Sequence, residues 1–385
     1  MTLPGLALFY AGLVQSKNVV SVLCQHFGIA CLMSIIWVIF GYSLAFSQGE
    51  SNLVGNLEKL FLSIPSDSLV GTIPEDLFAM FQMTFCIITP ALVIGAYVER
   101  IKFSVILSFS LLWLAVVYCP VAYWVWGGGF LAQMGIKDFA GGLVVHTTAG
   151  LAALIIALVL GKRRNFEKNT VSPPHSPVLT MIGASMLWVG WFGFNGGSAL
   201  AADATASKAI LVTHIAASVG AFSWIVIEWL RFGKPSLVGM ATGMVAGLAT
   251  ITPASGFVGV QGGLMLGLSG GVLCYLAVDI IRIKMKIDDS LDVFAVHGVG
   301  GMIGTVLCAW LMQSQLGGVG LDEGKSVMDH MKIQGYGVFV TGLWTIVVTF
   351  LILKIISMFS DLRVTEDEEL EGLDTSLHGE SGYNN

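Results

Sequence analysis

The sequence contains few charged residues. Only 11% of its 385 residues are Asp, Glu, Lys or Arg, whereas 55% are hydrophobic, and its mean hydropathy is +0.81. A soluble domain carries roughly 25% charged residues, so a chain with this deficit cannot cover its surface with groups that favour water. The composition excludes an ordinary soluble globular protein and indicates a polytopic membrane protein.

Signatures of cysteine chemistry and of catalysis are also missing. The six cysteines are scattered through apolar segments and no two form a C-x-x-C pair, so we interpret them as free, buried thiols. The chain has no Walker motif, no G-x-S-x-G elbow, no H-E-x-x-H pair and no nucleic-acid-binding signature. We therefore expect neither an enzyme nor a nucleic-acid-binding protein, and no metal or other cofactor.

Long apolar runs occupy most of the chain. A membrane-spanning helix needs about 20 mainly apolar residues. Ten segments fit this requirement, at residues 19–46, 77–98, 103–124, 139–161, 177–196, 207–230, 236–252, 259–281, 290–312 and 333–358. Residues 1–15 are apolar but too short to cross, and no signal peptide is visible. We expect ten full spans and a stub that corresponds to the second half of a truncated helix.

The basic residues are divided unevenly between the two sets of loops. One set of loops and ends carries 14 of the 19 lysines and arginines, and the alternate set carries five. Cytoplasmic loops of membrane proteins hold the excess of basic residues. The first set is therefore predicted to be cytoplasmic, and the C-terminus with it.

Two histidines lie in similar surroundings inside predicted spans. His146 and His297 each stand in a V-H-x-x-small-Gly segment, and an aspartate lies shortly upstream of each, Asp138 and Asp292. Counting the stub, five helices lead up to and include each copy. An odd number of spans makes the second unit run in the opposite direction, which is the inverted-repeat arrangement of many transporters.

This repeat sets the predicted domain organisation. The inverted repeats cover about 1–161 and 177–312, and a final span covers 333–358, so that residues 1–358 form one transmembrane domain. The polar, acidic segment 359–385 follows as a cytoplasmic tail. On composition alone such a tail is a solvated, partly disordered end.

We predict that the two imidazoles touch near the middle of the membrane. A lone buried histidine is often only a satisfied core residue, and haem held between the two is an alternative of another class. Ionisable groups inside spans are nevertheless rare and usually functional. Two neutral imidazoles can share one N–H···N bond and still offer a donor and an acceptor to a passing solute. Apolar surroundings favour these neutral forms, so the pair should line a path for a small solute.

Aromatic residues gather toward the external ends of several spans. Phe81 and Phe85 lie on one span, the segment WVGWFGFN ends another, and Trp126 opens the run W-G-G-G. Such rings form the aromatic belt of a membrane interface in many proteins. The alternative is a cation–π cup for a small cation, in which each partly desolvated ring contributes roughly 1–2 kcal/mol.

Several longer motifs resemble the Amt/Mep/Rh ammonium transporter family, most closely its bacterial ammonia channels. The resemblance runs essentially from end to end. It is carried by PGLALFYAGL at 4–13, KNVVSVL at 17–23, GYSLAF at 41–46, VWGGG at 125–129, DFAGGLVVH at 138–146, GWFGFNGGS at 190–198, VFAVHGVGG at 293–301 and LGGVG at 316–320. The resemblance implies an all-α membrane protein with an 11-span fold and a 5+5 inverted repeat, the first span being truncated here.

The family's pore residues carry over to positions in this sequence. The resemblance implies that His146 and His297 are the twin pore histidines, and that Phe85 and Phe194 are the stacked rings of an external gate. Because both histidines are present, the chain is similar to the Amt branch rather than to branches that replace the first histidine with an acid.

The resemblance also implies an entrance above the gate. Trp126 and Ser198 would recruit ammonium, with Phe85 as the floor of the cup. Asp138 would support this site as a capping or positioning group. The remaining supporting residues would be two pore-adjacent aromatics, Phe81 and Trp191.

Partners and location follow from the same resemblance. It implies a homotrimer in the cell (inner) membrane, with ammonium or ammonia as the substrate. It also implies that a cytoplasmic PII-type (GlnK-like) protein binds the tail at 361–385. The expected function is to recruit ammonium outside, deprotonate it and conduct ammonia past the histidine pair under PII regulation.

Overall fold

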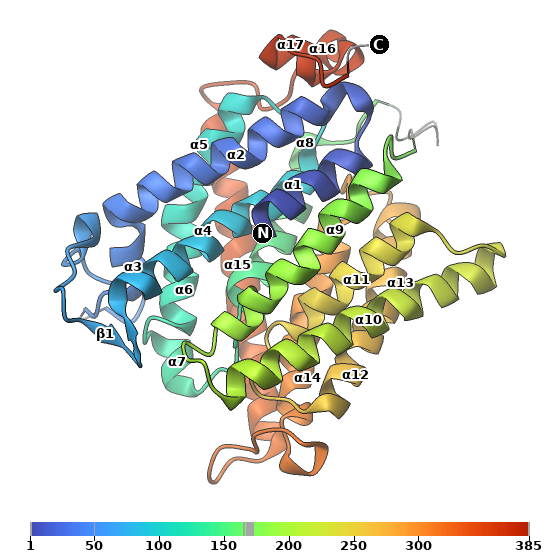
Figure 1. Ribbon diagram of the computed structural model, residues 1–385. Coiled ribbons are helices and arrows are strands. Elements are labelled where there is room, and N and C mark those ends of the chain that lie inside the picture. Colours follow the sequence, from blue (N-terminus) through green and yellow to red (C-terminus); the bar gives the residue numbers. More distant parts are fainter. Residues whose placement is uncertain (1, 50, 165, 167–172, 384–385) are drawn as a thin grey trace.

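Helices make up nearly all of the structure (Figure 1). The computed structural model describes residues 2–49, 51–164, 166 and 173–383. The only strands in this part of the chain are β1 (Leu69–Val70) and β2 (Ile73–Pro74), a short antiparallel hairpin. The expected all-α class is therefore confirmed. Lipid supplies no hydrogen-bond partners, and a helix is the form in which one apolar segment satisfies its own backbone.

The helices follow one another in two groups and a final helix. The first group is α1 (Thr2–Leu13), η1 (Ser16–Asn18), α2 (Val19–Ile36), η2 (Trp37–Gly41), α3 (Tyr42–Phe46), η3 (Leu60–Leu62), α4 (Glu75–Tyr97), α5 (Phe103–Trp113), η4 (Leu114–Tyr118), α6 (Cys119–Val125), α7 (Phe130–Met134), η5 (Gly142–Thr147) and α8 (Thr148–Leu160). The second is α9 (Pro177–Trp191), η6 (Phe192–Gly196), α10 (Ala204–Phe232), α11 (Leu237–Ile251), α12 (Val260–Ser269), η7 (Gly270–Cys274), α13 (Tyr275–Val278), η8 (Asp279–Lys284), η9 (Phe294–Gly298) and α14 (Val299–Leu311). After η10 (Ser314–Leu316), the last membrane-length helix is α15 (Val327–Ser357).

Nine helical stretches in the described residues are long and apolar enough to cross a membrane. They coincide with nine of the ten predicted full spans. The tenth, at 236–252, is the 15-residue helix α11, which matches the predicted bounds to within one residue at each end but is shorter than a full membrane span. Thr252 caps it, and Pro253 after that residue has no backbone N–H with which to continue the helix. The short apolar helix α1 lies where the stub was predicted.

The two histidine-bearing segments pack on each other reciprocally. His146 lies in the π-helical segment η5, which continues as α8, and His297 lies in η9, which continues as α14. α8 contacts η9, and α14 contacts η5. Each segment thus packs against the helix that follows its counterpart, as the predicted relation between the two repeats requires. π-helical turns are rare and are frequent at functional sites.

Two glycines allow this crossing. A side chain on Gly150 of α8 would collide with the backbone of Gly298, at the end of η9. Small residues let helix backbones approach closely in a membrane. The crossing therefore depends on the absence of side chains at this contact, and it brings the two histidine segments together.

The tail packs against the rest of the chain. Its helices α16 (Glu366–Glu371) and α17 (Leu373–His378) lie over one end of the bundle, beside the start of α2 (Figure 1). We call this the tail end and the opposite one, with Trp126, the cup end. Asp374 accepts the backbone N–H of Ser21 at 2.8 Å, and Leu373 N–H donates to Asn18 at 2.8 Å.

These contacts correct the compositional expectation of a partly disordered tail. Leu373 and Asp374 are both buried, although the segment around them is acidic. Hydrogen bonds to the chain's own backbone, which composition does not reveal, hold it in place. Residues 384–385 of the predicted tail and residue 1 of the first repeat lie outside the described residues.

Prediction for the glycine crossing. Gly150→Ala should destabilise the protein by about 2 kcal/mol, because an added methyl group overpacks the contact with Gly298. Thermal unfolding in detergent measures this effect. Gly335→Ala is the control, because that helical glycine has open space where the methyl group would be placed. Equal melting temperatures for the two variants would show that the crossing tolerates a side chain.

Candidate functional site

The two imidazoles are in direct contact, as predicted. His146 Nδ1 lies 3.3 Å from His297 Nδ1, and the ring planes are inclined by only 18° with centroids 5.2 Å apart. Both side chains are buried. One nitrogen must donate and the other accept, so the contact requires complementary tautomers. Rings stacked this closely leave no space for a haem between them, which removes that alternative.

Aromatic rings pack against the His146 side of the histidine pair. His146 stacks on Trp191 with centroids 5.6 Å apart and on Phe194 with centroids 6.1 Å apart. Trp191 is itself held by a 2.9 Å hydrogen bond from its indole N–H to Thr252. Among the described residues, His146 Nε2 has no hydrogen-bond partner. That nitrogen is therefore free to form a hydrogen bond with a small molecule.

An enclosed cavity lies beside the pair. Apart from Thr2 and the two imidazoles, apolar and aromatic side chains surround it. They are Leu6, Ile88, Leu92, Leu187, Trp191, Phe194 and Val245. Such a lining stabilises no full charge, because transfer of an ion from water into apolar surroundings is costly. The cavity suits a neutral solute.

The predicted gate rings lie together next to the histidines. Phe85 and Phe194 are buried, with ring centroids 4.5 Å apart and planes inclined by 50°. Phe81 packs edge-on against Phe85 at 4.9 Å. Because Phe194 also stacks on His146, the rings separate the histidine pair from the cup end.

The residues of the predicted cup surround these rings. Trp126 contacts Phe85 edge-on at 5.6 Å and is only partly buried. Ser198 is also partly buried, and its hydroxyl donates to the carbonyl of Phe194 at 2.9 Å. The hydroxyl oxygen keeps its acceptor capacity, and the Trp126 ring keeps a π-face. Both features suit a small cation.

Asp138 joins the cup to the histidine helix. Its buried carboxylate accepts the backbone N–H groups of residues 141–144 at 2.6–3.3 Å. This is the capping role expected from the sequence. The carbonyl of Asp138 accepts the Trp126 indole N–H at 2.8 Å. One residue thus fixes the start of the His146 segment with its side chain and the cup tryptophan with its backbone.

The structural counterpart of Asp138 is Asp289, which corrects the sequence comparison with Asp292. Asp289 accepts the backbone N–H of Phe294 at 2.7 Å and so caps the His297 segment. Asp292 has a positive φ of 58° and pairs with Arg282 at 3.6 Å. The spacing in the sequence indicates this equivalence, because Asp138 and Asp289 each precede their histidine by eight residues.

A larger cavity opens from His297 toward the tail end. Its lining carries many charged side chains, in contrast to the apolar cavity. They are Lys17, Glu99, Arg163, Arg164, Arg282, Asp292 and Glu369. We call this cavity the charged mouth. It was not predicted from the sequence, because the basic residues at the span ends were used only to assign the topology.

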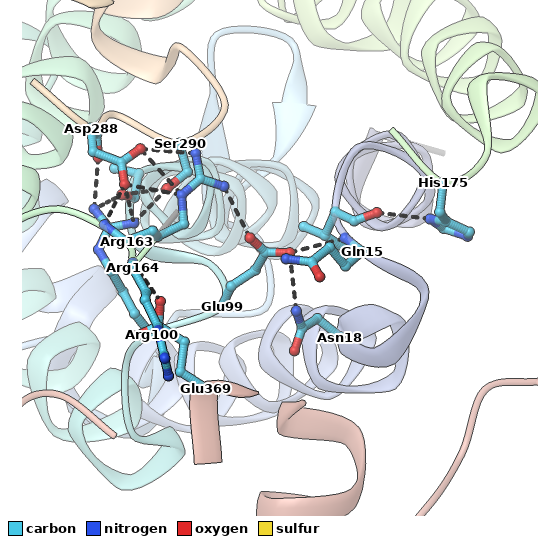
Figure 2. Close-up of polar contacts among 12 residues, drawn as sticks. Gln15, Asn18, Glu99, Arg100, Arg163, Arg164, His175, Asp288, Ser290 and Glu369 are labelled. Atoms are coloured by element: carbon cyan, nitrogen blue, oxygen red, sulfur yellow. Dashed lines mark hydrogen bonds and ion pairs between the residues drawn. The ribbon is translucent and has the colours of Figure 1, made fainter. Parts of the chain in front are cut away.

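Arg163 is the centre of a buried charge network at this mouth (Figure 2). Its guanidinium pairs with Glu99 at 3.0 Å and with Asp288 at 2.8 Å. Burial alone would raise the pKa of Asp288, but the Arg163 guanidinium outweighs burial and holds that pKa below its usual value. The pair therefore contributes stability at neutral pH, which is lost as the pH falls through the folded-state pKa.

The same network ties the tail to the mouth. The backbone N–H of Arg164 donates to the Glu369 carboxylate at 3.0 Å (Figure 2). Glu369 also pairs with Arg363 at 2.7 Å, and the Lys17 ammonium donates to the carbonyls of Glu369 and Leu370. The mouth and the tail are thus one connected polar unit.

Prediction for the charge network. Arg163→Met should destabilise the protein by about 3 kcal/mol, because it leaves the buried Glu99 without a counter-charge and the buried Asp288 with only Arg100, at 3.8 Å. Arg231→Met is the matched control, since Arg231 pairs with Asp279 at the surface and such pairs contribute little. Thermal unfolding in detergent separates the two. A similar loss for both arginines would contradict the central role of Arg163.

Comparisons with known proteins agree with this geometry. The profile of the Ammonium Transporter Family matches residues 1–383. The ammonium transporter of Bacillus subtilis is 45% identical over 387 residues, covering 99% of this chain and 94% of that protein. The ammonium transporter Amt1 of Archaeoglobus fulgidus is 44% identical, covering 100% of this chain and 95% of that protein.

Solved structures share the fold. A sensor Amt protein superposes with a TM-score of 0.91 at 29% identity, covering 98% of this chain and 94% of that one. Mep2 of Candida albicans superposes with a TM-score of 0.87 at 35% identity, covering 95% and 84%. The family profile matches nearly the whole length of the chain, and the chain has many apolar spans. It belongs to the ammonium transporter family.

Proposed function

We propose that the protein transports ammonium by recruiting NH4+ at the cup, removing a proton and conducting NH3 past His146 and His297. The observation that carries this proposal is the unbroken series of contacts along one path. Trp126 contacts Phe85, Phe85 contacts Phe194, and Phe194 stacks on His146. His146 touches His297, which lines the charged cavity at the tail end.

The cup would bind the cation before it loses a proton. The π-face of Trp126 attracts a cation, with an energy of roughly 1–2 kcal/mol when the site is partly desolvated. The Ser198 hydroxyl oxygen can accept one ammonium N–H while its own O–H donates to the Phe194 carbonyl. The buried Phe85 ring would close the floor.

Water at the partly exposed cup would accept the proton, so that NH3 rather than NH4+ enters the cavity beside the histidines. A charged ion gains no compensating partner from the aliphatic and aromatic lining, so entry of NH4+ carries a large desolvation cost. Ammonia carries no charge and makes both kinds of hydrogen bond. His146 Nε2 has no partner among the described residues and would form one hydrogen bond with ammonia. The imidazole pair replaces part of the hydration that ammonia leaves behind.

We further propose the setting in which this path operates. The cup end would face outward and the tail end the cytoplasm, since the loops predicted to be cytoplasmic hold 14 of the 19 basic residues. The chain would act as a homotrimer in the cell (inner) membrane, with residues 1–358 as its transmembrane domain. A PII-type protein would bind at the tail end and regulate transport through residues 361–385.

Prediction for the pore histidines. His146→Ala and His297→Ala should each lower ammonium uptake into proteoliposomes about tenfold, because each removes one hydrogen-bonding group from the path. Folding should persist, as judged by unchanged elution on size exclusion. His214→Ala is the control, since His214 is exposed on α10 and stacks on Trp188 away from the pair. Wild-type uptake by both pore variants would reject the assignment.

Prediction for the tail. Deleting residues 361–385 should abolish retention of a PII-type protein on the immobilised transporter, because the deletion removes α16 and α17, which lie over the tail end. Pull-down with purified components measures this. The point variant Tyr383→Ala, which removes the hydrogen bond and the ring contact with His175, controls for loss of the contact with one residue. Full retention by the truncated protein would assign the PII surface to the loops instead.

A further inference from the structure

A buried glutamine of α15 binds backbone groups on two other segments. Gln334 is fully buried, and its side chain makes three hydrogen bonds. The Lys137 N–H donates to its Oε1 at 2.8 Å, and its Nε2 donates to the carbonyls of Lys137 at 2.7 Å and Thr305 at 2.9 Å. The partners fix the orientation of the amide, because its NH2 group faces two carbonyls and its oxygen faces an N–H. None of these bonds belongs to the path described above.

The segment that Gln334 holds is the one on which the cup is built. Lys137 directly precedes Asp138, whose carbonyl accepts the Trp126 indole N–H. Phe139 follows and donates its N–H to the carbonyl of Pro253 at 2.9 Å. Gln334 therefore anchors the backbone one peptide unit away from the acceptor that orients the tryptophan.

Lys137 is also held by an ion pair of its side chain, which is weaker than the bonds of Gln334. The Lys137 ammonium pairs with Asp322 at 2.8 Å and lies 5.8 Å from the centre of the Phe257 ring. This ion pair is partly exposed, and exposed pairs stabilise little. The bonds of Gln334 are shielded from water, and losing them would leave two backbone groups of Lys137 unpaired. The amide is thus the principal anchor of the segment at Lys137.

We propose that Gln334 is a positioning residue for ammonium recruitment. Through Lys137 and Asp138 it sets the placement of the Trp126 ring above Phe85, and through Thr305 it ties that placement to α14, the helix that continues from His297. Its loss should weaken ammonium binding rather than slow passage, because Gln334 contacts neither the gate rings nor the histidine pair. This inference rests on the proposed function of the cup.

The first test replaces the amide by a side chain of similar size. In proteoliposomes, Gln334→Leu should raise the half-saturation concentration for methylammonium five- to twentyfold and change the maximal rate less than twofold. Gln25→Leu is the matched control, because Gln25 is also fully buried in a span but makes only one hydrogen bond, to Ser21. The control should keep the wild-type half-saturation concentration.

A double substitution tests whether Gln334 acts through the tryptophan. Trp126→Ala should itself raise the half-saturation concentration. If Gln334 works by placing this ring, Gln334→Leu added to Trp126→Ala should cause no further rise, since residues that act as one unit are not additive. Multiplication of the two effects would overturn the inference.

A third variant keeps the inference testable if the leucine variant fails to fold. Gln334→Glu as a carboxylate can accept only from Lys137 N–H, but as a carboxylic acid it can also donate to the Lys137 carbonyl. The quantity to follow is the ratio of the half-saturation concentration of Gln334→Glu to that of the wild type at the same pH. This ratio should fall toward one as the pH is lowered from 8 to about 5.5, because more of the glutamate is then in its acid form. The titratable groups nearby, Lys137, Asp138, Asp322 and His330, are present in both proteins, so the ratio isolates position 334.

The outcomes separate the inference from the proposed function. If the wild type takes up no methylammonium or ammonium, the proposed function fails, whatever Gln334 does. If the wild type shows saturable uptake and Gln334→Leu keeps its half-saturation concentration, the inference alone fails. A flat ratio for Gln334→Glu, or a fall in maximal rate without a change in half-saturation, would also overturn it.

Discussion

The structure depends on the close crossing of two helices that carry one imidazole each. Gly150 and Gly298 meet without side chains between them, and this contact brings His146 and His297 within 3.3 Å. The capping aspartates Asp138 and Asp289 then set where each segment begins. The aromatic rings, the cup and the charged mouth are all arranged around this pair. A membrane protein has no hydrophobic drive between its helices, so such close backbone contact is the main source of cohesion.

The charged side chains that line the proposed path lie at its tail end. At the tail end, Arg163 neutralises Glu99 and Asp288, so that polar side chains reach almost to His297 without an isolated charge. Toward the cup end, Trp126 and Ser198 present a π-face and a hydroxyl instead of a carboxylate. Between these ends the cavity offers imidazole nitrogens within an otherwise mainly apolar lining. Under the proposed function this arrangement would discriminate by hydration cost, because a neutral hydrogen-bonding solute loses far less than an ion.

Much of this could be predicted from the sequence, because lipid leaves few choices to an apolar segment. The length of each run, the position of both histidines and the capping by Asp138 follow from local patterns. The bounds of α11 also agree with the predicted span 236–252 to within one residue at each end. Gln334 was missed because a single polar residue in a span gives no hint of its partners. Those partners, at Lys137 and Thr305, are 197 and 29 residues away and are defined only by the packed fold.

The network around Arg163 also constrains the order in which the chain can be completed. Glu99 belongs to the first half, but Asp288 lies 125 residues after Arg163, in the second. At about 5–20 residues per second, the ribosome needs on the order of ten seconds to supply it. During that interval Arg163 has Glu99 but not yet Asp288 as a partner. The ion pair with Asp288, and the bond from Arg164 to Glu369, can therefore form only after the second half of the chain has been synthesised.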